Sequence, residues 1–432
     1  MIRHLRALAV VCGFLAASSL AAAEPKEWAQ KNLDDLVKLY RELHSHPELS
    51  FQEKETAARV AAEWKSAGFE VATGVGGHGV VAVLKNGPGK TLLLRTDLDA
   101  LPVTEETNLT YASRVKVKTD EGVDSGVMHA CGHDVHMTNL VGVARYLAAN
   151  RDAWKGTLLL IGQPAEERGG GAKAMLADKL FERFGKPDYC LALHCDANMP
   201  TGCVGVRGGP VLANVDSVDI TVKGRGGHGA YPHTTIDPIV EAAELVLALQ
   251  TIESREVKPT EPVVITVGSI HGGTKHNIIG NDCKLQITVR TYSDDVRRQV
   301  LDAIRRKAKG IAVSYGAPEP EISVSEGTPS LHNSDELANQ LVPVFRKVVG
   351  GEHVLPAEQS MGGEDFGRFG REGVPLVMYR LGSVDAKRLE RFKQIGQPPP
   401  SLHSSTYYPD VEEALVTGIG TMSAAALELL KK

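Results

Sequence analysis

The sequence predicts an α/β protein of two domains, in which a second α+β domain is inserted into the first. The chain has 432 residues, too many for one typical domain. In its first and last parts, short apolar runs alternate with helical patterns, which favours a sheet covered on both faces. In its middle part the expected elements follow the order β-α-β-β-α-β, the ferredoxin-like pattern.

The main domain draws its elements from both ends of the chain. Apolar residues recur at helical spacing over 33–43, and further helices are expected at about 53–66 and 137–148. Five short apolar runs have the character of buried strands: 80–84, 91–94, 157–161, 189–193 and 374–379. We therefore expect a central, mostly parallel sheet in a main domain formed by residues 24–212 and 328–432.

The inserted domain is expected at 213–327. Residues 215–222 alternate between apolar and polar, as in a half-buried strand, and apolar residues mark one face of a helix over 237–253. The elements that follow are strands at 263–267 and 285–291, a helix at 294–308 and a strand at 321–324.

The N-terminus has the pattern of a cleaved secretory signal. Arg3 and Arg6 precede an uncharged apolar stretch over 8–20, and small residues at 21–23 suit cleavage near Ala23. A membrane anchor is the alternative, but the apolar stretch is short for one. We expect a periplasmic or secreted protein without a membrane association after cleavage, since no later run is long enough to span a bilayer.

The net charge bears on possible binding partners, and the cysteine content bears on disulfide formation. The formal net charge is −5, and removal of Arg3 and Arg6 with the signal makes it −7, which gives no support for nucleic-acid binding. Cys12 leaves with the signal, so five cysteines remain and at least one cannot pair within the chain. Cys195 and Cys203 flank a short loop, and a disulfide between them stays open.

Polar side chains follow several of the predicted strands directly. Asp97 and Asp99 follow the strand at 91–94, the pair Glu166 and Glu167 follows 157–161, and His194 follows 189–193. Ligands bind beyond the carboxyl ends of strands in open α/β sheets, so these groups can converge on one crevice. Residues 131–133, Cys-Gly-His, form a turn before a helix and can join them.

These residue types suit a metal ion. Zinc takes thiolate, imidazole and carboxylate ligands, and Gly132 lets a turn aim Cys131 and His133 at one centre. One carboxylate of the glutamate pair can hold metal while the other stays free as a general base for water.

Each pattern alone also has a structural explanation. A Cys-x-His turn can serve packing, adjacent glutamates can begin a solvated helix, His194 can be an interior histidine, and Asp97 and Asp99 can cap a turn. The residues alone therefore predict a metal site, with hydrolysis as one possible function.

The full set of motifs resembles a known family. The matching stretches are 41–50 (RELHSHPELS), 95–102 (RTDLDALP), 128–138 (MHACGHDVHMT), 163–167 (QPAEE), 226–233 (GGHGAYPH), 362–367 (GGEDFG) and 402–407 (LHSSTY). They are similar to the two-metal amidohydrolases that include hippurate hydrolase, N-acyl-amino-acid amidohydrolases and auxin-conjugate hydrolases, within the aminoacylase and glutamate-carboxypeptidase superfamily. The match runs in family order over nearly the whole mature chain.

The resemblance implies a role for each matching residue of the main domain. The metal ligands would be Cys131, His133, Glu167, His194 and His403, with Cys131 at or between two metals. Glu166 would be the general base, and Asp99 the catalytic-site aspartate that orients a ligand. Asp97 stands where relatives outside this subfamily have a metal-binding histidine.

For the inserted domain, the resemblance implies a lid that also forms a homodimer. His228 would reach the active site of the partner subunit and stabilise the oxyanion. Asn277 and Arg290 would hold the free carboxylate of the substrate. Without the resemblance, His228 reads as a glycine-flanked turn residue and Arg290 as a charge on a strand surface.

The expected activity is metal-dependent hydrolysis of the amide bond of N-acyl amino acids or small peptides. The expected cofactors are two divalent metal ions per subunit, with zinc favoured by the thiolate and manganese, cobalt or nickel as alternatives. A metallo-dipeptidase or carboxypeptidase is the nearer alternative function. An exported peptide- or metal-binding protein without turnover is the more distant one, although a binder needs no second, free glutamate.

Overall fold

The computed structural model describes residues 24–119 and 122–432. The predicted signal at 1–23 lies outside these residues. An eight-stranded sheet with the order β1-β2-β6-β3-β7-β18-β8-β17 forms the centre of the main domain. Its strands are β1 (Glu70–Val75), β2 (Gly79–Asn86), β3 (Thr91–Asp97), β6 (Gly156–Gln163), β7 (Tyr189–Pro200), β8 (Val204–Val206), β17 (Val354–Pro356) and β18 (Leu376–Val384).

The middle of this sheet is parallel, as predicted. Parallel pairing joins β6 to β3, β3 to β7 and β7 to β18. The pairs β1–β2, β2–β6 and β18–β8 are antiparallel. The carboxyl ends of the four parallel strands therefore meet at one edge of the sheet. All five strands predicted for this domain are present, and β3, β6, β7 and β18 extend further toward that edge than predicted.

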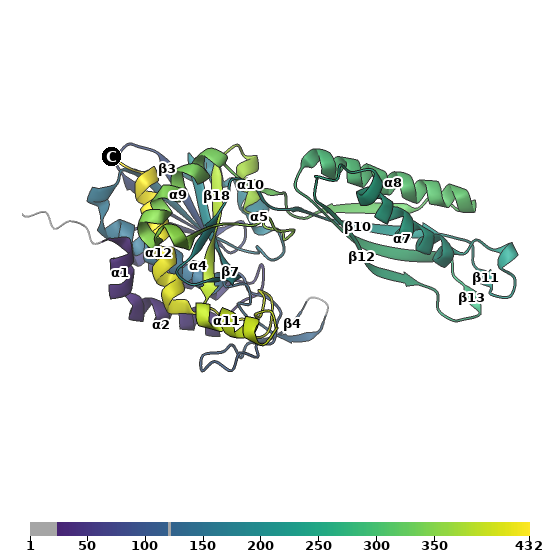
Figure 1. The fold of residues 1–432 in the computed structure, drawn as a ribbon, viewed down its shortest axis with the longest axis horizontal. Helices are drawn as coiled ribbons and strands as arrows, with labels where there is room; N and C mark the ends of the chain where they lie inside the picture. Colours follow the sequence, from purple (N-terminus) through teal and green to yellow (C-terminus); the bar gives the residue numbers. More distant parts are fainter. Residues whose placement is uncertain (1–23, 120–121) are drawn as a thin grey trace, which may run out of the picture.

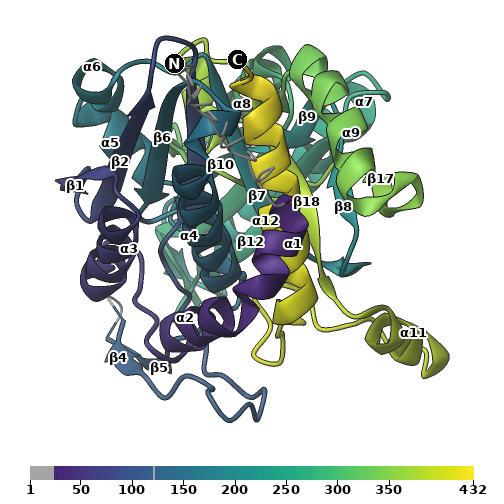
Figure 2. The ribbon, with the colours of Figure 1, turned by 90° about the vertical axis from the view of Figure 1, so that its left-hand side faces the viewer.

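Helices cover both faces of the sheet, because side chains along each strand alternate between two cores. Leu92 and Leu94 of β3 belong to one hydrophobic cluster and Leu93 to another. Figure 2 shows α3, α4 and α12 side by side across the face to which Leu92 and Leu94 point. The helices on this face are α2 (Leu33–Ser45), α3 (Lys54–Ser66), α4 (His133–Ala149), α9 (Asp335–Val349) and α12 (Val411–Leu429); α5 (Gly171–Ala177), α6 (Leu180–Phe184) and α10 (Gly367–Arg371) contribute to the other.

The inserted domain forms a separate layered structure that extends away from the main domain (Figure 1). An antiparallel sheet with the order β12-β14-β10-β15 carries two helices on one face, the arrangement of the ferredoxin-like fold. Its elements are β10 (Asn214–Lys223), α7 (Pro238–Arg255), β12 (Val263–Gly272), β14 (Asp282–Thr291), α8 (Asp294–Tyr315) and β15 (Glu321–Glu326). All six were predicted; the boundary residues 213 and 327 stay a prediction.

Shorter elements complete the described chain. They are α1 (Pro25–Lys31), β4 (Lys116–Lys118), β5 (Asp124–Gly126), β9 (Gly209–Leu212), β11 (Gly227–His228), β13 (Ile278–Ile279), β16 (Leu331–Asn333) and α11 (Ala386–Gln394). β11 and β13 pair at the end of the inserted domain that is distant from the main domain (Figure 1). The disulfide left open by the sequence is not formed, since Cys195 and Cys203 are buried free thiols. Over residues 24–119 and 122–432, no helix is long and apolar enough to cross a membrane.

Candidate metal centre

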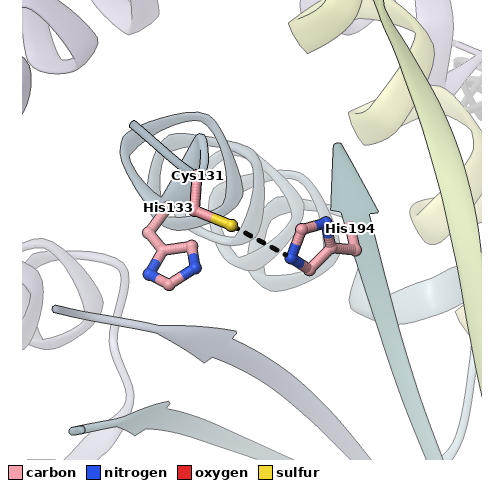
Figure 3. A group of neighbouring side chains, drawn as sticks. All are labelled: Cys131, His133 and His194. Carbon is pink, nitrogen blue, oxygen red and sulfur yellow. Dashed lines mark hydrogen bonds between the residues drawn. The ribbon is translucent and has the colours of Figure 1, made fainter. Parts of the chain in front are cut away.

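The predicted groups of the main domain converge at the carboxyl edge of the sheet. A tight turn carries Cys131 and His133 to this edge, where α4 begins at His133. Gly132 between them has a φ of 82°, and a Cβ there would lie 3.0 Å from the sulfur of Cys195. Only glycine combines this backbone conformation with such close packing, so the turn depends on it. The sulfur of Cys131 lies 3.6 Å from Nε2 of His194, which projects from β7 (Figure 3).

Both histidines are held in the tautomer that leaves Nε2 free as a ligand. His133 donates from Nδ1 to the backbone oxygen of Asp99 at 2.8 Å, and His194 donates from Nδ1 to the backbone oxygen of Cys195 at 2.8 Å. A hydrogen bond of this kind fixes the ring and leaves the lone pair on the other nitrogen. Nε2 of each ring therefore points into the cluster, where its lone pair can coordinate a cation.

The glutamate pair and His403 complete the cluster. Nε2 of His133 lies 3.7 Å from Oε1 of Glu167 and 3.8 Å from Oε2 of Glu166. Oε2 of Glu167 lies 3.5 Å from Nε2 of His403. The donor atoms form overlapping groups within 4.8 Å: Cys131, His133 and His194; Cys131, Glu167 and His403; and His133, Glu166 and Glu167. All five residues predicted as ligands and the predicted base are thus brought together.

The two aspartates have different surroundings. Asp99 accepts hydrogen bonds from Ser50 Oγ at 2.6 Å and from the backbone of Glu167 at 3.0 Å, so its carboxylate positions the glutamate pair. Asp97 is bound by Arg95 at 2.6 Å and by Nδ1 of His136 at 2.7 Å. These contacts occupy the carboxylate of Asp97, whose Oδ2 lies 3.7 Å from Nε2 of His133 and forms a further group of possible ligands with His133 and His136.

Negative charge dominates the centre. Burial, together with the charges of Glu364 and Glu167, raises the pKa of Glu166 well above its ordinary value. Burial and the charge of Asp99 raise the pKa of Glu167 to about 7. Burial and the nearby glutamates likewise raise the pKa of the Cys131 thiol. Cations placed among these groups would relieve this repulsion and favour their ionised forms.

The residues present fit a metal ion by an independent observation. Nε2 of His133, Oε1 of Glu167 and Oδ1 of Asp99 are buried atoms without a hydrogen-bond partner in the described chain. Buried polar atoms are costly unless they are paired, and a coordinated cation satisfies them. The set of thiolate, imidazole and carboxylate donors is the one that zinc and related divalent ions use.

A cavity of about 610 Å³ opens from the cluster toward the inserted domain. Cys131, Glu166, His194 and His403 lie on one side of it, and Arg290 on β14 lines it from the inserted domain. Arg290 is half-buried and donates to Thr288 at 2.9 Å, so the predicted carboxylate-binding arginine does reach the cavity.

His228 and Asn277 do not line this cavity within their own chain. Both are exposed and belong to the region of β11 and β13, at the far end of the inserted domain (Figure 1). The structure therefore brings Arg290 to the centre from the inserted domain and leaves His228 and Asn277 at its tip.

Three supporting residues were not predicted as part of the site: Arg95, His136 and Glu364. Arg95 is buried and bonds both Asp97 and Glu364. Arg95 lies two residues before Asp97 on a strand, so both side chains lie on the same face. His136 lies three residues after His133 on a helix, so the two side chains are neighbours. The spacing along the sequence could therefore have indicated both residues. Glu364 lies 269 residues from Arg95 along the chain, and no local pattern could have indicated that pair.

A buried ion-pair cluster next to this centre predicts a pH-dependent stability. His44 in α2 is 1% exposed, and its ring bonds Asp134 at 2.6 Å and Glu105 at 3.2 Å. Burial alone would lower the pKa of His44, but the two carboxylates outweigh it and raise the pKa from 6.5 to about 9. The stabilisation is then complete below pH 6.5 and lost as the pH rises through about 9.

We expect the free energy of unfolding to fall by about 1 kcal/mol per pH unit from this histidine between those values. Urea unfolding of the wild type and of His44→Gln at several pH values measures the effect. The variant should lose this part of the pH dependence. Equal slopes in the two proteins over this range would show that His44 is not charged in the fold.

A cluster of possible metal ligands at the carboxyl edge of an α/β sheet faces an inserted α+β domain across a cavity, an arrangement typical of a two-domain metal-dependent hydrolase. Comparison with known proteins agrees. Residues 93–408 match the peptidase family M20/M25/M40. Thermostable carboxypeptidase 1 of Saccharolobus solfataricus is 37% identical over 359 residues, which cover 82% of this chain and 87% of that protein. N-acetylcysteine deacetylase of Bacillus subtilis is 35% identical over 350 residues, covering 81% of this chain and 88% of that protein.

A solved structure supports the same assignment. The YXEP protein of Bacillus subtilis, described as a dinuclear metal-binding peptidase from the M20 family, superposes with a TM-score of 0.77 at 31% identity. The superposition covers 93% of this chain and 99% of that one. The chain therefore belongs to peptidase family M20/M25/M40, in agreement with the family resemblance of its motifs.

Proposed function

We propose that this protein hydrolyses the amide bond of N-acyl amino acids or small peptides, with two divalent metal ions held by Cys131, His133, Glu167, His194 and His403. The observation that carries the proposal is the buried cluster in which the free Nε2 atoms of two fixed histidines meet a thiol and two carboxylates. The relatives named as a carboxypeptidase and a deacetylase support the same bond type.

The metal ions supply Lewis acidity, which polarises the amide carbonyl and makes water easier to deprotonate. We propose zinc as the native metal because Cys131 offers a soft thiolate, with manganese, cobalt and nickel as alternatives that geometry and availability decide. The donor set therefore favours zinc over magnesium or calcium, which prefer oxygen ligands alone.

Glu166 performs the proton transfers. Its carboxylate is buried at the cavity wall beside Glu167, and since it is not one of the five proposed ligands it stays free to take up and release a proton. It takes a proton from the attacking water and delivers it to the leaving nitrogen. Asp99, bonded to Ser50 and to the backbone of Glu167, holds the glutamate pair in place for both steps.

The inserted domain binds the substrate. Arg290 reaches the cavity and binds the α-carboxylate of the substrate. Asn277 lies with His228 at the tip of the domain, so we propose that Asn277 of the partner subunit joins Arg290 in this contact. The backbone of Ala230 donates to Nδ1 of His228 at 3.0 Å, so the ring carries its proton on Nε2 and can donate it to an oxyanion. Because His228 lies at the tip of its own domain, we propose that His228 of the partner subunit completes each site.

Exposed apolar side chains on the inserted domain support a homodimer through this domain. Leu247 on α7 is 71% exposed, Val240 is 51% exposed, and Ile270 on β12 is 49% exposed. Val240 and Leu247 are seven residues apart and so lie on one face of α7, which makes this face a candidate for the dimer interface. The predicted signal at 1–23 supports the further proposal that the mature protein acts in the periplasm or outside the cell.

A substrate panel tests the proposed function and separates it from its nearest alternative. We expect release of free amino acid from N-acetyl and N-benzoyl amino acids with a higher kcat/KM than from dipeptides of the same C-terminal residue. A higher kcat/KM on dipeptides would assign the protein as a metallo-dipeptidase or carboxypeptidase, which the relative named thermostable carboxypeptidase favours. Binding of these compounds by metal-loaded protein without any cleavage would instead assign an exported binding protein.

A further inference from the structure

Arg380 lies beside the metal centre, and the mechanism above does not use it. It belongs to β18, and its Cα is in register with that of His194 on the neighbouring parallel strand β7. Side chains in register on parallel strands point to the same face. Arg380 is half-buried and lines the same cavity as Cys131 and Glu166.

The guanidinium of Arg380 has no ion pair and no hydrogen bond to any residue of 24–119 or 122–432. Two other arginines that are buried or half-buried have carboxylate partners: Arg95 bonds Asp97 and Glu364, and Arg297 bonds Asp216 through two hydrogen bonds. A half-buried guanidinium that has no acceptor in the chain is available to bind an anion. An anionic ligand in the cavity would supply the acceptor that the chain does not.

Arg380 also stands where two cavities meet. A second cavity of about 680 Å³ shares Ser360, Arg380 and Leu402 with the central one. Asp196 and Glu358 line that second cavity too, and Glu358 is exposed at its rim. Because its register with His194 places Arg380 beside the metal centre, we expect its acceptor in the central cavity, where the substrate would lie.

Two guanidinium groups without carboxylate partners therefore face the central cavity from opposite domains. Arg290 faces it from the inserted domain and Arg380 from the main domain, and in the described chain neither forms an ion pair. The proposed function assigns one substrate carboxylate to Arg290. A substrate with one carboxylate would leave Arg380 unpaired.

We propose that Arg380 binds a second carboxylate of the substrate, so that the preferred substrates are N-acyl amino acids with two carboxylates. The inference rests on the proposed function and deepens it. The second carboxylate can belong to the acyl group or to the side chain of the amino acid, and both present the same chemistry to a guanidinium.

Two pairs of near-isosteric substrates test the proposal. N-succinyl-leucine is compared with N-succinamoyl-leucine for the acyl group, and N-acetylglutamate with N-acetylglutamine for the side chain. We expect the zinc-loaded wild type to favour the charged member of one pair by about 10- to 100-fold in kcat/KM, the range of a charge-assisted, bidentate contact. Arg380→Met should abolish that ratio, and Arg380→Lys should restore part of it.

Arg305→Met is the matched control, because it removes a guanidinium from the surface of α8, where Arg305 bonds Asp302. It should keep the wild-type ratio. Metal content is measured for every variant, since loss of metal in Arg380→Met would place its role at His194 and overturn the proposal. Equal losses for the charged and neutral members, or a wild type that does not discriminate in either pair, would overturn it as well. Cleavage of none of the four substrates would reject the proposed function itself, whereas cleavage without discrimination rejects this inference alone.

Discussion

Replacing Glu166 by glutamine should lower kcat by about 10²- to 10⁴-fold, the usual contribution of a general acid or base. The amide keeps the size of the side chain but cannot take a proton from water. Glu166 is not among the proposed ligands, so metal content should stay near two equivalents per subunit. Steady-state kinetics on the best substrate of the panel, combined with metal analysis of the same sample, measures both quantities.

Glu326→Gln provides the control for this experiment. Glu326 lines the same cavity and loses the same charge, but its side chain is exposed and lies 4.0 Å from Arg297. We expect wild-type kinetics within about twofold, since exposed ion pairs contribute little. A Glu166→Gln variant that turns over at the parental rate would exclude Glu166 as the base, and one that loses its metal would reassign it as a ligand.

Replacing His228 by alanine should lower kcat by about 10²- to 10³-fold, as loss of an oxyanion-stabilising donor does. Complementation between two variants can show which subunit supplies His228 to each active site. Coexpression of His228→Ala with Glu166→Gln, each with its own tag, allows the mixed dimer to be purified. One of its two sites then combines an intact Glu166 with an intact His228 of the partner subunit.

The mixed dimer should recover about half of the wild-type activity, because one site in two is complete. The two homodimeric variants measured in parallel supply the baseline. A mixed dimer as inactive as its parents would show that His228 acts within its own chain, and a fully active His228→Ala homodimer would show that it does not act at all. The gel-filtration profile of the wild type reports whether the dimer exists.

The features that the sequence predicted well depend on short-range patterns. The spacing of apolar residues predicted the four strands and two helices of the inserted domain, and apolar runs predicted the parallel strands of the main sheet. Because polar side chains at the carboxyl ends of parallel strands meet at one edge, Glu167, which follows one strand, and His194, which lies on another, could be placed in one cluster. The geometry of the Cys131–His133 turn followed from the single glycine between them.

Other features depend on contacts that no local pattern records. The helix α12 carries buried residues around most of its circumference, including Ala425 and Ala426, so it shows no amphipathic stripe to predict it. The pairing of Arg95 with Glu364 joins distant segments. The position of His228, which the resemblance assigned to an active site, became informative only when the fold placed it at the tip of the inserted domain.

Metal dependence tests the central claim most directly. The mature protein is stripped with a chelator and titrated with zinc, while release of amino acid from the best substrate of the panel is followed. Hydrolysis should be absent from the stripped protein, rise with added zinc and level off near two equivalents per subunit, and Cys131→Ser should bind less metal. Full activity in the stripped protein, or two bound equivalents without cleavage of any N-acyl amino acid or dipeptide, would contradict a metal-dependent amide hydrolase.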